Sequence, residues 1–180
     1  MIEKIKPVLR KKHFEEVNPL TIKDNVFKLI GKDWMLITAG DIKKFNTMTA
    51  SWGGLGVLWK VNVSYIVIRP SRYTFEFMEK TDSFTLSFFE KRHREALKFC
   101  GRRSGRDVDK IKKTGLTPKE GALGVYFEEA RLVMECKKMY YQDLIPKQFL
   151  DERIEKNYGK TDYHRMYIGE VVKTYLGVKT

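Results

Sequence analysis

The segment from Asn46 to Thr74 gathers side chains that could hold a polar ligand. It reads NTMTASWGGLGVLWKVNVSYIVIRPSRYT, with small hydroxyl and glycine residues first and an arginine-rich turn last. Small residues let a ligand approach the main chain, and hydroxyl and amide groups supply hydrogen bonds. The turn carries two guanidinium groups and three hydroxyls, which suit a phosphate. The segment therefore predicts a ligand with a flat polar ring at one end and a phosphate at the other, and FMN is such a ligand.

Several strings in one order resemble the flavin reductase-like, FMN-binding split-barrel family, in its flavoredoxin-like branch. They are NTMTASWGG followed by RPSRYT, FTLSFF at Phe84 to Phe89, CGRRSGRDVDK at Cys100 to Lys110, and HRMYIGEVV at His164 to Val172. The resemblance extends from about residue 20 to the C-terminus. The family usually has a basic residue and a proline after the second tryptophan, where this chain has Val61 and Asn62.

The resemblance implies a mainly β fold, an FMN-binding split β-barrel of Greek-key type with peripheral helices. Residues 21–180 would form this single domain, after an N-terminal arm over residues 1–20 that contains Pro7 and Pro19. The resemblance also implies that FMN binds at a homodimer interface, because a barrel of this size offers a groove too shallow to bury a flavin alone.

The resemblance places the cofactor contacts on three segments. We expect the flavin ring along Asn46, Thr47, Met48, Thr49, Ala50, Ser51 and Trp52, and the phosphate at the turn and helix start formed by Arg69, Ser71, Arg72, Tyr73 and Thr74. The third segment would contribute Ser104, Arg106 and Lys110.

Each segment also has a purely structural interpretation. Thr and Ser residues in a turn often bond their own backbone. The arginines could face solvent, with Thr74 as a helix N-cap, and Asp107 could cap a following helix. Trp59 could pack between strands instead of against a flavin.

His164 is the candidate catalytic residue. The resemblance implies that a histidine four positions before the Ile168-Gly169 pair points at the exposed face of the flavin. There it could contact a nicotinamide or donate a proton toward flavin N5, which suits a group that titrates near neutrality. The alternative is a half-exposed polar residue at the start of a strand.

The chain has 180 residues, a net charge of +12 and a pI of about 9.6. Its basic residues gather between Lys91 and Lys113, which is compatible with a nucleic-acid interface, a solvated helical face, or a cationic mouth that attracts anionic nucleotides. We favour the last. Two cysteines and no metal-ligand spacing predict neither a disulfide framework nor a metal site. The sequence shows neither a secretory signal nor a membrane-length apolar run, so we expect a cytoplasmic protein with no membrane partner.

Sequence patterns also predict the secondary structure. The expected strands are a hairpin of Val26–Ile30 and Trp34–Thr38, long strands within Val57–Ile68, a strand at Phe84–Phe89, a hairpin of Leu123–Glu128 and Ala130–Tyr141, and a last strand at Tyr163–Tyr175. The expected helical parts are a helix from Thr74, helical structure over Lys91–Thr114 broken at Gly101 and Gly105, and a helical turn at Pro146–Asp151. A loop should lead from Gly40 to Asn46.

Two functions share this cofactor. The first is an NAD(P)H-dependent flavin reductase, in which NADH or NADPH gives a hydride to FMN without a protein nucleophile. The second is an electron carrier of flavoredoxin type, reduced by another protein. A basic nucleic-acid-binding module is the alternative from another class, and we consider nucleic acid an unlikely partner.

Overall fold

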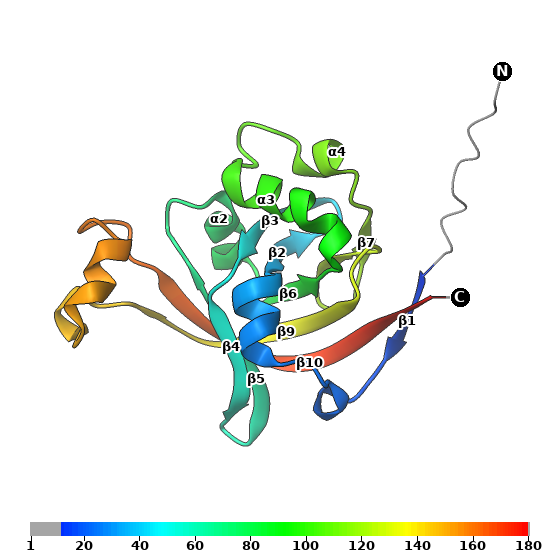
Figure 1. Ribbon diagram of the computed structural model, residues 1–180, viewed down its shortest axis with the longest axis horizontal. Coiled ribbons are helices and arrows are strands. Elements are labelled where there is room, and N and C mark those ends of the chain that lie inside the picture. Colours follow the sequence, from blue (N-terminus) through cyan, green and yellow to red (C-terminus); the bar gives the residue numbers. More distant parts are fainter. Residues whose placement is uncertain (1–11, 180) are drawn as a thin grey trace.

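The computed structural model describes residues 12–179 as a curled antiparallel sheet with helices at its periphery (Figure 1). Eight strands form the main sheet: β1 (Lys12–Glu16), β2 (Met35–Asp41), β3 (Lys44–Ala50), β4 (Gly53–Leu58), β5 (Val61–Ile68), β6 (Ser83–Phe88), β9 (Leu132–Asp143) and β10 (Arg165–Lys179). Strands β7 (Pro118–Glu120) and β8 (Val125–Phe127) form a small second sheet. The helices are α1 (Val26–Lys28), α2 (Tyr73–Lys80), α3 (Arg94–Arg102) and α4 (Lys110–Thr114).

The order of the strands explains why the barrel is split. Hydrogen-bonded neighbours run β3-β2-β6-β9-β10-β5-β4, and β1 pairs with β10 beside this path. The sequence neighbours β3 and β4 therefore stand at the two ends of the path, joined only by Ser51 and Trp52. The predicted split β-barrel is confirmed.

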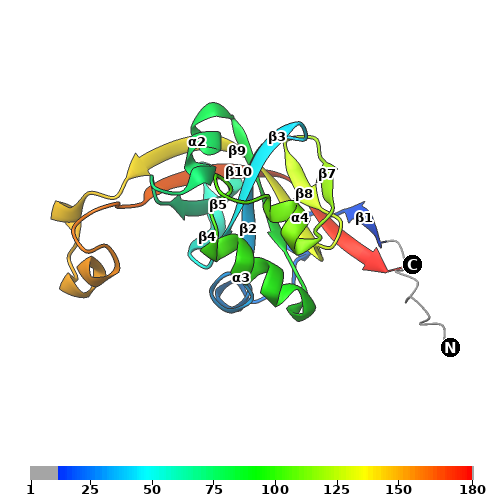
Figure 2. The same ribbon diagram turned by 90° about the horizontal axis from the view of Figure 1, so that it is seen from above.

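The inner face of the sheet forms the main hydrophobic core. Phe84, Phe88, Ile66 and Tyr167 are fully buried there, together with Met78 from α2. Burying large apolar side chains of this kind contributes about 1.5–3 kcal/mol each to folding. A second core lies under α3, whose Leu97 and Cys100 are buried. Helices α2, α3 and α4 cover the part of the sheet that contains β2 and β3 (Figures 1 and 2).

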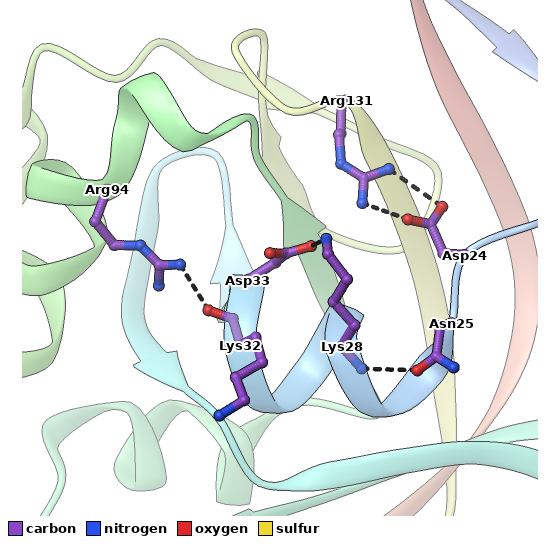
Figure 3. A network of polar contacts seen from close by, with 7 residues as sticks. All are labelled: Asp24, Asn25, Lys28, Lys32, Asp33, Arg94 and Arg131. Carbon is purple, nitrogen blue, oxygen red and sulfur yellow. Dashed lines mark hydrogen bonds and ion pairs between the residues drawn. The ribbon is translucent and has the colours of Figure 1, made fainter.

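The hairpin expected from Val26 to Thr38 is wrong in its first half. Residues Val26–Lys28 form α1, and Leu29–Asp33 continue it as one π-helical turn before β2 begins at Met35. Polar contacts within this helical segment hold its shape, and others connect it to α3 and to the residue before β9 (Figure 3). Within the segment, Asn25 Oδ1 accepts from the Lys28 N–H at 3.0 Å, and Lys28 Nζ donates to Asp33 at 2.5 Å. From other elements, Arg94 donates to the Lys32 carbonyl at 2.6 Å, and Arg131 donates to both carboxylate oxygens of Asp24 at 2.6 and 3.2 Å. Asn25 is thus an N-cap, which turns a short apolar run into helix.

Other expected boundaries also change. Residues 1–11 of the expected N-terminal arm lie outside the described residues, and residues 12–16 form strand β1 on β10. The expected loop to Asn46 is a tight turn, because Asn46 to Ala50 belong to β3. Val57–Ile68 contains a hairpin whose turn residues Trp59 and Lys60 have positive φ of 52° and 64°. Trp59 is 52% exposed at this turn, so it is not packed between strands.

The hairpin expected around Glu128 and Glu129 does not form. Strand β8 pairs with β7, whereas β9 pairs with β6 and β10. The break expected at Gly101 is wrong, because α3 continues through it to Arg102. The break expected at Gly105 is confirmed, because this residue lies between the end of α3 and the start of α4 at Lys110. The strand at Phe84–Phe89 and the long last strand are confirmed as β6 and β10.

Residues 144–164, between β9 and β10, form a lobe that projects away from the barrel (Figures 1 and 2). It contains two 3₁₀ segments, Pro146–Gln148 and Glu152–Asn157, the first of which matches the expected helical turn. Within residues 12–179, no helix has the length and apolarity needed to cross a membrane, and no cluster of His, Cys, Asp and Glu side chains could hold a metal ion.

Candidate functional site

Two adjoining cavities lie at the split of the barrel. The ring cavity has a volume of about 190 Å³ and is lined by Met48, Thr49, Ala50, Ser51, Trp52, Val67, Arg69, Arg72 and His164. The phosphate cavity has a volume of about 360 Å³ and is lined by Met48, Arg69, Ser71, Arg72, Tyr73, Thr74, Arg102, Arg103, Ser104, Arg106, Lys110 and Asp162. Because Met48, Arg69 and Arg72 line both, one elongated ligand could occupy the two together.

The structure brings every predicted site residue to these cavities except Asn46 and Thr47. Asn46 is buried and donates from Nδ2 to the Thr74 hydroxyl at 2.7 Å. Thr47 is also buried, and its hydroxyl donates to the Ile37 carbonyl at 3.2 Å. These two hydrogen bonds connect β3 to α2 and to β2.

Thr49 lines the ring cavity, but its hydroxyl is already used. It donates to the Leu97 carbonyl at 2.5 Å and so ties β3 to α3. Ser51 and Trp52 follow at the end of β3, where the chain crosses to β4. Trp52 is 44% exposed, and its ring lies 5.1 Å from the imidazole of His164, centroid to centroid. These two rings form one aromatic wall of the ring cavity.

The arginine-rich turn leads directly into α2. Arg72 occupies the N-cap position of α2, with an extended backbone and no side-chain cap bond, so the prediction that Thr74 is the cap is wrong. Thr74 is instead buried in the first turn, where it accepts the bond from Asn46. The first main-chain N–H groups of a helix lack intrahelical acceptors, and the helix dipole favours an anion there.

Both arginines of the turn are held by main-chain carbonyls. Arg72 donates to the Gly101 carbonyl at 2.8 Å, at the end of α3. Arg69 donates to the Asn157 carbonyl at 2.6 Å and lies 3.9 Å from the Asp162 carboxylate. These contacts fix the guanidinium groups beside the cavities, and they connect Arg69 to the projecting lobe.

The Ser104 to Lys110 segment completes the cationic side of the phosphate cavity. Arg106 donates to the Ser71 carbonyl at 3.1 Å and to Glu76 at 2.5 Å, and Ser104 Oγ accepts from the Arg106 N–H at 3.1 Å. Lys110 is buried, and its ammonium donates to the carbonyls of Thr47 at 2.6 Å and Cys100 at 3.0 Å.

Burial lowers the pKa of Lys110 to about 8. The helix α4 that begins at Lys110 is capped by Asp109, whose carboxylate accepts from the Lys112 N–H at 2.9 Å, so the predicted cap at Asp107 is wrong.

His164 lies at the base of the lobe, immediately before β10. It is only 8% exposed, and its Nδ1 is 3.0 Å from the Tyr158 hydroxyl oxygen. Burial, followed by the positive charge of Arg69, lowers the pKa of His164 to about 4. The expectation of a group that titrates near neutrality is therefore wrong, because a buried imidazole beside an arginine resists protonation.

A family comparison agrees with this architecture. The model of the flavin reductase like domain matches residues 27–179, which is most of the chain. The chain belongs to the flavin reductase-like family. A search of curated proteins found no match.

Three solved structures that resemble this flavin reductase-like domain are distant from it in sequence. One is an FMN-binding domain of a flavin reductases-like enzyme from Shewanella baltica, with 16% identity and a TM-score of 0.67 over 92% of this chain and 78% of the other. Flavoredoxin from Methanosarcina acetivorans has 22% identity and a TM-score of 0.64 over 89% and 76%. An NADH:FAD oxidoreductase from Streptomyces globisporus has 15% identity and a TM-score of 0.59 over 81% and 78%. At these identities the similarity establishes the fold.

Sequence reasoning missed several residues that line the two cavities of this flavin reductase-like domain. Arg102 and Arg103 were visible as consecutive arginines before Ser104, inside the basic segment. Val67 and Asp162 carried no signal, because only folding places the barrel strand and the lobe beside the arginine turn.

A larger cavity of about 570 Å³ lies between the β2–β3 turn, α2 and the β7–β8 connection, and Tyr73 is the only predicted site residue in its lining. Its ionic side chains are of mixed sign, including Asp41, Glu76 and Lys80, so it lacks the concentrated positive charge of the phosphate cavity.

Proposed function

We propose that this protein is an FMN-binding oxidoreductase of the NAD(P)H-dependent flavin reductase type. The observation that carries the proposal is the pairing of two cavities with different chemistry around shared residues. The ring cavity is formed largely by aromatic, aliphatic and small polar side chains, whereas the phosphate cavity gathers Arg69, Arg72, Arg102, Arg103, Arg106 and Lys110. A flavin with a phosphate at one end matches this division.

The ring end of the site depends on the position of β3 in the sheet. Among the described strands, β3 has a partner on one edge only, β2. The Thr47 carbonyl accepts from Lys110, which comes from outside the sheet. Because main-chain groups alternate in direction along an antiparallel strand, we expect those of Thr49 and Ser51 to face the same edge as those of Thr47. They would supply hydrogen bonds to the polar edge of a flavin ring, and Trp52 and Val67 would pack against its surface.

The phosphate end would use the start of α2 together with its cations. Ser71 and Tyr73 line the cavity together with Arg69 and Arg106. Charge-assisted bonds from guanidinium groups to phosphate oxygens are stronger than neutral hydrogen bonds. Lys110 would act mainly by position, because its ammonium already bonds two carbonyls.

Bound FMN would supply the redox chemistry, because its ring accepts a hydride, a proton with two electrons, from the C4 position of a reduced nicotinamide. The protein then has to bind and orient both rings. With a pKa of about 4, His164 is neutral at pH 7. It would therefore position a ligand through a neutral N–H or its aromatic face and would not act as an imidazolium acid.

We also propose that the protein works as a homodimer. Strands β4, β5, β9 and β10 expose apolar and aromatic side chains, among them Leu58, Tyr65, Met139, Tyr140 and Val172. Tyr65 and Val67 are two residues apart on β5 and therefore lie on the same face of the sheet, and Val67 lines the ring cavity. Exposed apolar side chains favour association, and a second copy that covered them would close the open side of the ring cavity.

An exposed aromatic side chain beside the ring cavity supports a second function. An electron carrier needs a surface where a redox partner protein can approach the flavin, and Trp52 is 44% exposed beside the ring cavity. In this function FMN would stay bound while another protein supplies the electrons.

Anaerobic stopped-flow mixing tests the proposal. The purified protein should carry or take up FMN, and NADH or NADPH should bleach its flavin absorbance within seconds. Slow or absent bleaching with both nicotinamides would favour the electron carrier, and a protein that takes up no FMN would refute both. Light scattering should give twice the chain mass. A gel shift with DNA or RNA that persists at moderate salt would instead support the nucleic-acid alternative.

A further inference from the structure

A third cavity, the α3–α4 groove, lies next to the phosphate cavity and is unused by the proposed function. It has a volume of about 480 Å³, and its lining comes from α3, the residue after it, and α4. Four cations surround it: Lys98, Arg102, Arg103 and Lys113. Ala96 and Phe99, both half-buried, supply apolar surface in the same groove.

Positive charge is in excess in this groove. Glu95 is its only carboxylate, and it accepts from Lys98 at 2.7 Å. Over residues 12–179, Arg102, Arg103 and Lys113 form no ion pair within 4.0 Å. Cations at the C-terminal end of α3 favour its dipole, which accounts for Arg102 and Arg103 in part. The dipole of α3 does not account for Lys113, which approaches from α4.

The groove shares two lining residues with the phosphate cavity of the proposed flavin site. Arg102 and Arg103 line both the groove and the phosphate cavity. An anion held between these two guanidinium groups would therefore be adjacent to a phosphate bound at Arg69 and Arg72. A ligand that extends beyond a flavin phosphate would meet the same two arginines at the groove.

We propose that the α3–α4 groove is an adenosine phosphate subsite. This proposal rests on the proposed flavin function, which puts the first phosphate in the neighbouring cavity. The groove combines an aromatic side chain for a flat purine with an excess of cations for a phosphate, and its volume lies within the range of about 300–1,000 Å³ typical of small-molecule sites. Two ligands carry this chemistry: FAD, whose adenylate continues from the flavin phosphate, and NAD(P)H. The shared arginines favour FAD.

Fluorescence titrations with FAD, FMN, ADP and NADPH test this subsite. The test variant is Lys98→Ala/Lys113→Ala, because these lysines line the groove and neither flavin cavity. The matched control is Lys91→Ala/Lys112→Ala, which removes the same charge from exposed lysines outside the groove. For the wild type we expect FAD to bind at least about tenfold more tightly than FMN, because one charge-assisted contact between a groove lysine and the adenosine phosphate of FAD contributes about that much affinity. The test variant should lose this advantage with FMN affinity unchanged, and the control should keep it.

The other ligands distinguish the source of the adenosine phosphate. One outcome would assign the groove to the nicotinamide dinucleotide. In it, the wild type binds FAD and FMN with equal affinity, and the test variant alone binds NADPH about tenfold more weakly when it is loaded with FMN. If neither flavin binds, the proposed function fails, and ADP binding that needs Lys98 and Lys113 would still support the subsite. Two results would overturn the subsite: no effect of the test variant on FAD, ADP or NADPH, or tighter binding of single-stranded DNA than of ADP through the same lysines.

Discussion

The carboxylate of Asp162 accepts two hydrogen bonds from Ser71, at the turn that leads into α2. Its Oδ1 is 3.0 Å from the Ser71 N–H nitrogen, and its Oδ2 is 2.6 Å from the Ser71 hydroxyl. Asp162 comes from the lobe, where it has a positive φ of 54°. A carboxylate therefore already uses donors that the sequence assigned to a phosphate, and it places a negative charge at the rim of the phosphate cavity.

Replacing Asp162 by Asn should strengthen FMN binding. The amide keeps the size and one acceptor oxygen but removes a charge that repels phosphate. We expect FMN affinity to rise several-fold to about tenfold and riboflavin affinity to stay constant, because riboflavin has no phosphate. Asp151→Asn is the control, since this exposed lobe aspartate pairs with Arg153 and lines neither flavin cavity. An unchanged FMN affinity would mean that the phosphate does not approach Ser71.

Replacing Arg72 by Ala should weaken FMN far more than riboflavin. A charge-assisted contact to the phosphate is worth on the order of 1.5–3 kcal/mol, or roughly a factor of ten to a hundred in affinity. Arg72 is exposed, so the thermal midpoint without ligand should change little. Arg69→Ala should weaken FMN similarly, but it also removes the bond to the Asn157 carbonyl and should loosen the lobe.

Two controls complete the arginine test. Arg153→Ala removes an exposed lobe arginine outside the flavin cavities and should leave both flavin affinities unchanged. Ser51→Ala should affect FMN and riboflavin alike, because Ser51 lines only the ring cavity. Equal loss of both flavins in Arg72→Ala would place the phosphate elsewhere.

The buried imidazole of His164 should make stability depend on pH. Its pKa is lowered from 6.5 to about 4, so between these values the unfolded chain binds more protons than the folded protein. Stability should therefore fall as the pH decreases from 6.5 toward 4, by up to about 3 kcal/mol from this group alone. Urea unfolding of the wild type and of His164→Gln over this range measures the difference, and parallel curves would show that His164 is not buried as a neutral ring.

Gly53 should tolerate no side chain at the start of β4. Its φ is +145°, and an added Cβ would lie 2.6 Å from the Tyr65 carbonyl oxygen. We expect Gly53→Ala to lower the free energy of unfolding by about 2–4 kcal/mol. In the same strand, a Cβ on Gly56 meets no atom within 4 Å, so Gly56→Ala should be neutral or slightly stabilising. A denaturant titration measures the free energy of unfolding of both variants. Equal values for Gly53→Ala and Gly56→Ala would contradict the close approach of β4 to β5 at Gly53.

Local sequence patterns predicted the long strands well and the short elements poorly. The alternating Phe84–Phe89 run and the long β10 segment fold as expected because their apolar faces have one core to bury against. The run from Val26 to Ile30 is equally apolar, but the Asn25 cap and the ion pair of Asp24 with Arg131 select a helix. Asp24 and Arg131 are far apart in the sequence, so no local pattern contained their contact.

The sequence by itself determined the chemical inventory: a Thr- and Ser-rich strand, an arginine turn before a helix and a basic segment, in the order that resembles the flavin reductase-like family. Residue types and spacing carry that information without coordinates. Only the tertiary structure decided how each group is used. It buried Asn46 and Thr47 in hydrogen bonds, put the Asp162 carboxylate on Ser71, and lowered the pKa of His164. Burial, charge and hydrogen-bond partners at each site come from segments far apart in the chain, and only folding brings those segments together.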